Sequence, residues 1–364
     1  MKIEKISLIN FRNFEKDSIN FHPQTTVLIG DNGQGKTNLL ESIYFLSMGR
    51  SFRLKDDKEL VLHNKEISKV LGVFNEKDVR QTITAVLHPQ GKTILVNKNP
   101  ITSIKSFIGQ IHTIVFSPLD MTFFDGSPKN RRKFLDSEGS KCSQSLVEAL
   151  FQYNKTHKER NLYLKQDKKD SSYLDVLDQQ MALYQQEILR FRKEFVDFLN
   201  QEVTGFYQQL SSEKAVITID YKSIFDLNKI EDKKHIMSVI HEFRDKDLYY
   251  KSTHAGVHRD DIETFLDGYP IDVYASQGQK RLVIIAVKLA LIQYIQKVKN
   301  ITPILLLDDV FSELDSTKKN KFISMLPNNI QTIITTTDLN DISNIQSNDM
   351  IVYTIKNGHA YKGV

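Results

Sequence analysis

The hydrophobic pattern of the first 120 residues predicts short strands and one early helix. Apolar and polar residues alternate over 3–10, and a continuous apolar run covers 25–29. Leucine and isoleucine then recur at helical spacing over 36–47, which predicts an amphipathic helix. Turn residues at 88–91 and 97–100 separate further alternating segments and indicate β-hairpins. This part therefore combines a strand–helix unit with an antiparallel sheet.

From about residue 127 the period becomes helical, and one segment carries a heptad seam. Four heptads correspond to about 40 Å of helix at about 1.5 Å per residue. Aromatic residues in the seam favour packing inside a helical lobe over a projecting coiled coil. Weaker helical periodicity flanks this segment on both sides. The seam consists of Leu174, Leu177, Met181, Tyr184, Ile188, Phe191, Phe195 and Phe198.

Strand and helix signals return after the helical region. A β segment at 216–221 and an Asp-Gly turn at 267–268 come first. The pattern then predicts a long helix over 277–297, buried strands over 303–307 and 332–336, and a strand over 350–355 before an Asn-Gly hairpin turn at 357–358.

Composition is that of an ordinary globular protein. The chain has 364 residues, of which 40% are hydrophobic and 26% charged, enough for two domains. Cys142 is the only cysteine, which excludes an intramolecular disulfide or a C-x-x-C zinc site and favours a reducing compartment. The apolar stretch 281–296 carries Lys288 and is too short for a membrane span, and the first residues lack a signal-peptide core. We therefore expect a cytoplasmic protein with no membrane partner.

The net charge of +4 is small, but basic residues gather in two places. Either group could contact a polyanion, and either could equally be a solvated helix surface. The two groups are Lys129, Arg131, Arg132 and Lys133, and Lys155, Lys158 and Arg160.

The clearest motif is the phosphate loop Gly-Asp-Asn-Gly-Gln-Gly-Lys-Thr at residues 30–37. An apolar strand precedes it and an amphipathic helix follows it, as a G-x-x-x-x-G-K-[ST] loop requires. Its glycines let backbone N–H groups face phosphate, Lys36 reaches the β and γ phosphates, and the Thr37 hydroxyl ligates Mg²⁺. ATP and Mg²⁺ are therefore the expected cofactors. The predicted nucleotide-binding residues here are Gly30, Asp31, Asn32, Gly33, Gln34, Gly35, Lys36, Thr37 and Asn38.

A second nucleotide signature is the apolar run 304–307 followed by Asp308 and Asp309. A buried strand of this kind delivers its carboxylates to the sheet edge where ligands bind. We expect Asp308 to hold Mg²⁺, directly or through water, and Asp309 to orient or deprotonate the attacking water. Asp309 and Lys36 are thus the predicted catalytic residues.

The third motif is Ala275-Ser276-Gln277-Gly278-Gln279, just before the predicted long helix. It resembles the Leu-Ser-Gly-Gly-Gln signature of the ATP-binding-cassette ATPases, and the segment 312–315 resembles their D-loop. The resemblance implies that Ser276 and Gly278 contact the γ phosphate held by the other subunit and that Gln279 also belongs to the nucleotide-binding residues. The fold class we predict is α/β, a cassette-type phosphate-loop ATPase head split by a mainly helical second lobe. Its parts would be 1–120, the first ATPase half; 121–245, the helical lobe; and 246–364, the second ATPase half.

Within the cassette class the chain resembles the bacterial RecF recombination mediators. The resemblance implies a slow, DNA-stimulated ATPase that binds single-stranded and gapped or junction DNA as an ATP-dependent homodimer. With RecO-type and RecR-type partners, such a protein assists recombinase loading in DNA repair, replication and the SOS response. The matching segments are 10–14, 35–38, 117–118, 131–136, 258–261 and 274–281.

Some positions depart from the cassette pattern or have no firm role. Asp309 stands where most cassette ATPases carry glutamate, and its shorter side chain predicts slow turnover. Residues 335–338, Thr-Thr-Thr-Asp, replace the switch histidine of transporters. Gln110 is the expected Q-loop residue and a metal ligand, but it lies far from the phosphate loop for a compact cassette and could instead be an ordinary turn glutamine. Arg12 could approach the nucleotide or lie on the surface, and His258 and Arg259 match the family without an assigned chemistry.

Two other classes share these nucleotide motifs. A transporter cassette subunit has a shorter helical subdomain than the roughly 150 residues that separate the two halves here. A structural-maintenance or Rad50-type chromosome protein has far longer coiled-coil arms and a C-x-x-C hook that a single cysteine cannot supply.

Overall fold

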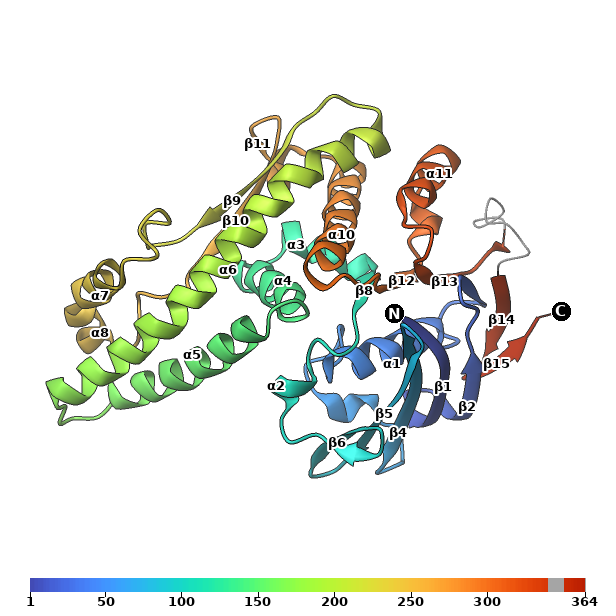
Figure 1. The fold of residues 1–364 in the computed structure, drawn as a ribbon, viewed down its shortest axis with the longest axis horizontal. Coiled ribbons are helices and arrows are strands. Elements are labelled where there is room, and N and C mark those ends of the chain that lie inside the picture. The colour runs from blue at the N-terminus through green and yellow to red at the C-terminus, as the bar shows by residue number, and fades with distance from the viewer. Residues whose placement is uncertain (340–349, 364) are drawn as a thin grey trace. The chain divides into compact units, whose positions relative to one another are not determined.

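The computed structural model describes residues 1–339 and 350–363, and the chain forms two compact units (Figure 1). The first unit comprises Met1–Asp120, Gln209–Ser212 and Ile285–Val364, and the second comprises Met121–Gln208 and Glu213–Ile284. The predicted restart of the ATPase domain at residue 246 differs from this division, in which residues 246–284 belong to the second unit.

The first unit contains a six-stranded, mainly parallel sheet. Only the pair at its β15 end is antiparallel. β12 and β13 are buried along their whole length, because both faces of a parallel sheet are covered. In spatial order the strands are β15 (His359–Lys362), β14 (Met350–Lys356), β3 (Thr25–Ile29), β13 (Gln331–Thr336), β12 (Ile304–Asp308) and β8 (Thr113–Phe116).

A second six-stranded sheet of the same unit is antiparallel throughout. Its strands alternate buried and exposed residues, so that one face is apolar. In spatial order they are β2 (Phe14–Asn20), β1 (Lys2–Phe11), β4 (Ser68–Glu76), β5 (Val79–His88), β6 (Gly91–Val96) and β7 (Asn99–Pro100).

Helix α1 (Lys36–Met48) joins these two sheets into one core. Its leucines and phenylalanine pack in a single cluster with apolar side chains of both sheets, and all five side chains named next are fully buried. They are Leu39, Leu40, Ile43, Phe45 and Leu46. Other helical segments of this unit include α2 (Ile104–Phe107), α11 (Ser316–Met325) and the 3-10 turns Asp57–Leu60 and Phe311–Glu313.

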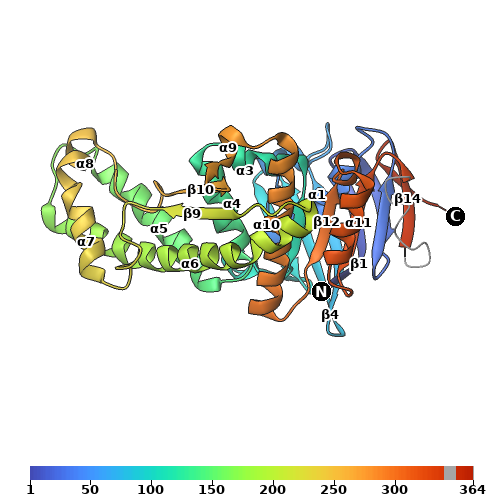
Figure 2. The same ribbon diagram turned by 90° about the horizontal axis from the view of Figure 1, so that it is seen from above.

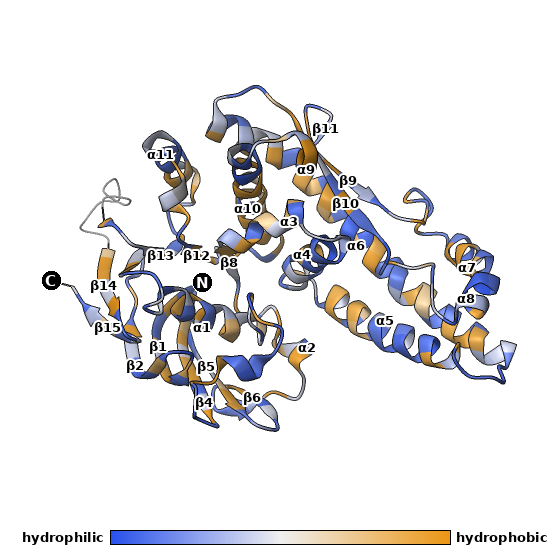
Figure 3. Ribbon diagram, turned by 180° about the vertical axis from the view of Figure 1, so that it is seen from behind, coloured by the Kyte–Doolittle hydropathy of each residue, from blue (hydrophilic) through white to orange (hydrophobic). Residues whose placement is uncertain are grey.

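The second unit is mainly helical. Figures 1 and 2 both show α5 running beside the much longer α6, and α5 alternates apolar and polar colour along its length, as a helix with one buried face does (Figure 3). The helices are α3 (Thr122–Asp125), α4 (Pro128–Ser140), α5 (Gln144–Tyr163), α6 (Ser171–Ser211), α7 (Lys233–Glu242), α8 (Arg244–Tyr250) and α9 (Ile271–Tyr274). Helix α10 (Gln277–Lys299) belongs to this unit up to Ile284.

The predicted heptad seam lies on α6, which is 41 residues or about 60 Å long. Seven of its eight residues are buried, and Tyr184 is half-buried. A three-stranded antiparallel sheet, formed by β11 (Tyr269–Pro270), β10 (Asp261–Leu266) and β9 (Ile217–Lys222), completes the unit. The pattern at 216–221 predicted β9, but β10 was not predicted.

The other predicted elements of the first unit are confirmed to within a few residues. Strands at 3–10, 25–29, 303–307 and 332–336 and the helix at 36–47 correspond to β1, β3, β12, β13 and α1. In the part of the chain that the structure describes, no helix has the length and apolarity needed to cross a bilayer. Lys288 of α10 is buried and donates to the Val115 carbonyl at 2.6 Å, with Asp120 at 2.9 Å.

Candidate nucleotide-binding site

The parallel sheet brings the phosphate loop and the two aspartates to one edge. β13 lies between β3, which precedes the loop, and β12, which ends at Asp308. The strand register places Asp308 beside Thr335, and Thr336 beside Ile29. Because the carboxyl ends of parallel strands share an edge, motifs 271 residues apart in the chain meet there.

The phosphate loop ends in a helix N-terminus that no side chain of residues 1–339 or 350–363 caps. Gly35 occupies the N-cap position of α1 with φ 117°, and Gly33 has φ 80°, conformations that L side chains rarely adopt. The first N–H groups of α1 therefore remain available to an anion. Lys36 Nζ donates to the carbonyls of Gly30 and, at 2.9 Å, Asp31. Burial lowers the pKa of Lys36, while the charges of Asp309, Asp308 and Asp31 oppose that shift.

The base of the loop is held by segments far away in the sequence. Asn13 Nδ2 donates to the Gln34 carbonyl at 2.8 Å, and Asn38 donates to Asn13 Oδ1 at 2.8 Å. From the turn between β14 and β15, the Asn357 N–H donates to Gln34 Oε1 at 2.7 Å and the Gly358 N–H to the Gln34 carbonyl at 3.1 Å. Gln34 thus links the phosphate loop to Asn13 and to the β14–β15 turn.

Thr37 and Asp308 form the pair predicted to hold Mg²⁺. Thr37 Oγ1 donates to Asp308 Oδ1 at 2.7 Å, and Thr335 Oγ1 donates to the same oxygen at 3.0 Å. A hydroxyl and a carboxylate this close are the hard oxygen donors that Mg²⁺ takes in nucleotide sites, so the residues present fit the ion. Burial raises the pKa of Asp308, and the two hydroxyl donors oppose the rise.

Asp309 has a strained backbone and an unsatisfied carboxylate oxygen. Its φ is +55°, which is uncommon for a residue other than glycine. The Asp309 N–H donates to Thr335 Oγ1 at 2.9 Å, and its carbonyl accepts from the Ser312 hydroxyl at 2.8 Å. Asp309 Oδ1 is buried and has no hydrogen-bond partner among the described residues. Strain of this kind gathers at functional sites, and an unsatisfied acceptor suits a proton acceptor.

These groups line one pocket of about 260 Å³. The pocket brings together most of the predicted loop residues with both aspartates, and it adds three residues that were not predicted to bind nucleotide. The lining residues are Asn32, Gly33, Gly35, Lys36, Thr37, Asn38, Arg53, Pro118, Asp308, Asp309 and Thr335.

Arg53 is the main addition, because it brings a second cation to the pocket. Its Nη2 donates at 2.6 Å to both Asn38 Oδ1 and Glu41 Oε2. Glu41 is fully buried on α1 and also accepts from Arg12 Nε at 2.8 Å and from the Ser51 hydroxyl. Arg12 is therefore engaged with α1 in this structure. Burial alone would raise the pKa of Glu41, but the hydrogen bonds from Arg53, Arg12 and Ser51 outweigh it and lower that pKa.

The lowered pKa gives a pH-dependent stability prediction for Glu41→Gln. A carboxylate whose folded pKa lies below its unfolded value of about 4.3 stabilises the fold above that pH and loses this contribution as the pH falls. The variant should lose about 1–3 kcal/mol of unfolding free energy at pH 7, because two arginines lose a charged partner. The difference from wild type should shrink below about pH 4.3.

Denaturant unfolding at several pH values measures this difference. The matched control is Glu15→Gln. The Glu15 side chain is 71% exposed and makes a long ion pair with Lys65 at 3.8 Å, so the substitution should change the unfolding free energy by less than about 0.5 kcal/mol. A Glu41→Gln effect that is the same at pH 3 and pH 7 would contradict the assignment.

Gln110 does not line the pocket. Its Nε2 donates to the Ser106 carbonyl at 3.1 Å and its N–H to the Phe107 carbonyl at 3.2 Å, at the end of α2. The amide therefore closes a short helix, as an ordinary turn glutamine would, and Gln110 does not meet the aspartates here.

The signature motif starts α10 in the second unit. The Gln279 N–H donates to Ser276 Oγ at 3.2 Å, and the Ser276 N–H donates to Gln279 Oε1 at 3.1 Å, a reciprocal capping box. Within the described part of the chain, a Cβ added at Gly278 would meet only Ser276 Oγ, at 3.9 Å, so the helix start is uncrowded there. The roles of Ser276, Gly278 and Gln279 toward a nucleotide stay predictions.

The 258–261 motif braces the second unit. His258 Nδ1 lies 2.6 Å from the Tyr153 hydroxyl, and its Nε2 lies 3.2 Å from the Thr253 carbonyl. Burial, with the nearby His157, lowers the pKa of His258 to about 3, so the ring is neutral near pH 7. Asp260 accepts from Arg192 at 2.9 Å and from the hydroxyls of Tyr221 and Ser223. These contacts give His258 a structural role.

Three of the basic residues considered for DNA contact are engaged inside the second unit. Arg131 forms a two-pronged ion pair with Asp261, and Arg132 donates to the Asp260 carbonyl at 2.5 Å. Arg160 is fully buried between Asp178 and Asp247, so its candidacy was wrong. Exposed members of the two groups are Lys129, Lys133, Lys155 and Lys158.

Comparison with known proteins gives a consistent result. The RecF/RecN/SMC N terminal domain family matches residues 2–109. A DNA replication and repair protein RecF from Streptococcus thermophilus is 34% identical over 100% of this chain and 99% of its own length. The solved structure of the recombination mediator protein RecF–ATP in the RecFOR pathway has a TM-score of 0.91 and 32% identity, covering 100% of this chain and 97% of that one. The Smc head domain of Pyrococcus furiosus, at 18% identity and a TM-score of 0.57, shares the fold.

Proposed function

The chain belongs to the RecF family, and we propose that it is an ATP-dependent DNA-binding protein of recombinational repair and replication. It binds single-stranded and gapped or junction DNA as an ATP-induced homodimer in the cytoplasm. With RecO-type and RecR-type partners it assists recombinase loading and the SOS response. The similarity to RecF proteins extends over the whole chain. It therefore argues against the two alternatives, a transporter cassette subunit and a structural-maintenance or Rad50-type chromosome protein.

The observation that carries this proposal is the set of contacts joining Thr37, Asp308, Thr335 and Asp309 beside Lys36. Lys36 and the α1 N-terminus hold phosphate oxygens, and Asp309 accepts a proton from the attacking water. Mg²⁺ held by Thr37 and Asp308 would neutralise phosphate charge. Structures of RecF relatives with ATP support the choice of nucleotide.

Slow hydrolysis fits a switch rather than a motor. Asp309 is one methylene shorter than the glutamate expected at its position, and its backbone is strained at φ +55°. ATP then stabilises the dimer across Ser276 and Gly278 of the second subunit, and hydrolysis releases it.

Sedimentation velocity with Mg²⁺ and ATP, ADP or no nucleotide tests the dimer, and a parallel titration tests DNA. We expect a dimer when ATP is present and a monomer with ADP or without nucleotide. Binding to gapped and single-stranded DNA should be tighter with ATP and should weaken steeply with salt, because phosphate contacts dominate such binding. A monomer at every nucleotide condition would exclude the proposed mechanism, and salt-independent DNA binding would exclude the proposed contacts.

Arg53→Ala should weaken ATP binding at least tenfold, about 1.4 kcal/mol. The guanidinium is held in the pocket by Asn38 and Glu41, and its removal takes one of two cations from the phosphate site. Fluorescence titration with a labelled ATP analogue measures the change. Arg50→Ala is the control, because Arg50 is half-buried but does not line the pocket; equal losses in the two variants would mean a general charge effect.

A further inference from the structure

Arg259 is the residue of the 258–261 motif that the contacts of the second unit leave without a role. Its neighbours in the motif are engaged in the fold: His258 contacts the Tyr153 hydroxyl, and Asp260 accepts from Arg192. The Arg259 side chain is exposed and makes no hydrogen bond or ion pair with any residue of 1–339 or 350–363. A guanidinium carries five N–H donors, so all of them remain available to a ligand.

The backbone at Arg259 is held in place. The Arg259 N–H donates to the Gly256 carbonyl at 2.9 Å, which closes a tight turn. Gly256 has φ 152°, and a Cβ at that position would lie too close to the Tyr153 hydroxyl. Because the turn packs against buried groups, only the Arg259 side chain is free to move, and it points away from the packed interior.

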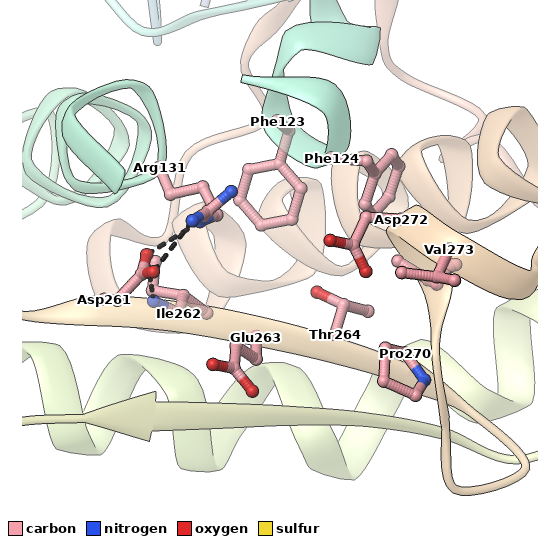
Figure 4. Close-up of a pocket in the computed structure, with 11 residues that line it drawn as sticks. Phe123, Phe124, Arg131, Asp261, Ile262, Glu263, Thr264, Pro270, Asp272 and Val273 are labelled. Atoms are coloured by element: carbon pink, nitrogen blue, oxygen red, sulfur yellow. Dashed lines mark hydrogen bonds and ion pairs between the residues drawn. The ribbon is translucent and has the colours of Figure 1, made fainter. Parts of the chain in front are cut away.

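Two arginines near this turn show how the others are used. Arg131 donates through Nε and Nη2 to the two oxygens of Asp261, at 2.7 Å each, beside a pocket of the second unit (Figure 4). Arg192 is buried and donates to the Val257 carbonyl at 2.8 Å and to Asp260 at 2.9 Å. The two carboxylates of the motif are therefore already bound, and neither is paired with Arg259.

Two imidazole rings lie next to Arg259 and carry no negative charge. The ring of His258 is 4.2 Å from that of His157, measured between centroids. Burial lowers the pKa of His157, and the charges of Arg160 and Arg259 lower it further, against the opposing charge of Asp247. Asp247 is itself buried and bound to Arg160 at 2.7 Å. The surroundings of Arg259 thus hold neutral rings and cations, an arrangement that favours an anion.

Helix α5 adds further donors beside His157. The Asn161 Nδ2 group can only donate and lies 3.0 Å from His157 Nε2, so the neutral ring carries its proton on Nδ1. Lys158 follows His157, is exposed, and has no partner among the residues that the structure describes. The sequence contains no carboxylate between Glu148 and Glu159. This stretch of α5 therefore offers hydrogen-bond donors and cations without competing acids.

We propose that Arg259, together with His157 and Lys158, forms a contact site for the phosphate backbone of DNA on the second unit. The inference rests on the proposed function, in which the chain binds DNA, and adds a place where the strand is held. The planar fork of a guanidinium matches phosphate oxygens, and an imidazole N–H and an ammonium supply further donors. Contacts of this kind position a protein on DNA without reading its sequence.

Arg259→Ala tests the site by fluorescence anisotropy with labelled gapped and single-stranded DNA, Mg²⁺ and ATP. We expect affinity to fall by about tenfold on both substrates and on any base sequence, because a phosphate contact is lost. The slope of log affinity against log salt should decrease by about 1. Binding of a labelled ATP analogue, ATP-dependent sedimentation and the thermal unfolding midpoint should equal those of wild type, because the side chain holds no other residue.

Arg190→Ala is the matched control, since it removes the same charge from the same unit. Arg190 is exposed on α6, but its guanidinium is bound to Glu231 at 2.7 Å and to Glu187 at 2.8 Å, so DNA affinity should stay within about twofold of wild type. Arg259→Lys should keep the wild-type salt slope, because the charge remains, while its affinity lies between those of wild type and Arg259→Ala.

Each other result overturns the inference in a distinguishable way. Wild-type affinity and salt slope in Arg259→Ala contradict the contact site but leave the proposed function standing. A wild-type protein that binds no DNA with any nucleotide removes the proposed function and the inference together. Equal losses in Arg259→Ala and Arg190→Ala mean a general charge effect. Loss of RecR-type partner binding with DNA affinity intact assigns Arg259 to an acidic surface of that partner.

Discussion

Asp309→Asn is expected to lower ATP turnover at least a hundredfold while leaving ATP binding within about threefold of wild type. The change keeps the shape of the side chain but replaces its basic carboxylate by an amide, and loss of a general base costs about 10²–10⁴ in rate. Asp309 Oδ1 is buried and receives no hydrogen bond from the described residues. No structural hydrogen bond therefore reduces the basicity of this oxygen. Phosphate release under single turnover, with labelled-ATP titration beside it, measures both quantities.

The second effect of Asp309→Asn should be a longer-lived ATP dimer, because hydrolysis is the proposed release step. Asp308→Asn is the comparison, since Asp308 accepts from Thr37 and Thr335 and is expected to affect Mg²⁺. We expect that variant to need more Mg²⁺ for ATP binding and Asp309→Asn to need no more than wild type. If both variants change the Mg²⁺ requirement equally, Asp309 is a metal ligand and not the base.

Arg160→Ala is expected to cost about 3–5 kcal/mol of unfolding free energy, the largest stability effect that we predict. Arg160 has no exposed surface, and its guanidinium donates to Asp178 at 2.6 Å, Asp247 at 2.7 Å and Thr253 at 2.9 Å. Removing it leaves two buried carboxylates with one cation fewer, since Asp178 keeps its 2.6 Å ion pair with Arg244 and Asp247 keeps only its contacts with His254 and neighbouring groups. Chemical denaturation followed by tyrosine fluorescence and circular dichroism should show the second unit unfolding at lower denaturant concentration.

Arg190→Ala provides the matched control on α6. Arg190 contacts Glu231 at 2.7 Å and Glu187 at 2.8 Å, but 38% of its side chain is exposed, so its removal should cost less than about 1 kcal/mol. Arg160→Lys should recover only part of the lost unfolding free energy. A single lysine ammonium cannot reproduce the planar guanidinium that donates to both Asp178 and Asp247. Equal effects of the two alanine variants would show that burial does not govern these ion pairs.

Sequence patterns predicted the elements whose signals are local. A continuous apolar run gave β12, and helical spacing gave α1 and most of α6, because burial on one or both faces imposes those periods. The phosphate loop and the two aspartates were found from their residue motifs and the strands and helix predicted beside them, and the structure joins them through the Thr37–Asp308 contact.

Features that depend on distant partners were not predictable in this way. Strand β10 is short, and its main partner β9 lies about forty residues earlier, so the Asp-Gly turn at 267–268 marks only the end of β10 and not its pairing. Arg160 looked like a surface cation because its partners, Asp178 and Asp247, lie 18 and 87 residues away. Arg53 carries no motif at all, and only the fold of the segment after α1 brings it to Asn38. A helical run of lysine and arginine in sequence is compatible with either surface or interior positions.

The bracing of Gln34 by the turn at Asn357 and Gly358 has a consequence for synthesis of the protein. Every residue that lines the phosphate pocket has been translated by residue 335, yet two of the hydrogen bonds that hold Gln34 come from residues 357 and 358, beside the one from Asn13. Gly358 also approaches the Asn13 carbonyl too closely for a side chain. A nascent chain still attached to the ribosome therefore holds the whole pocket lining before it holds all the contacts of Gln34, so tight nucleotide binding should appear only after the β14–β15 hairpin docks.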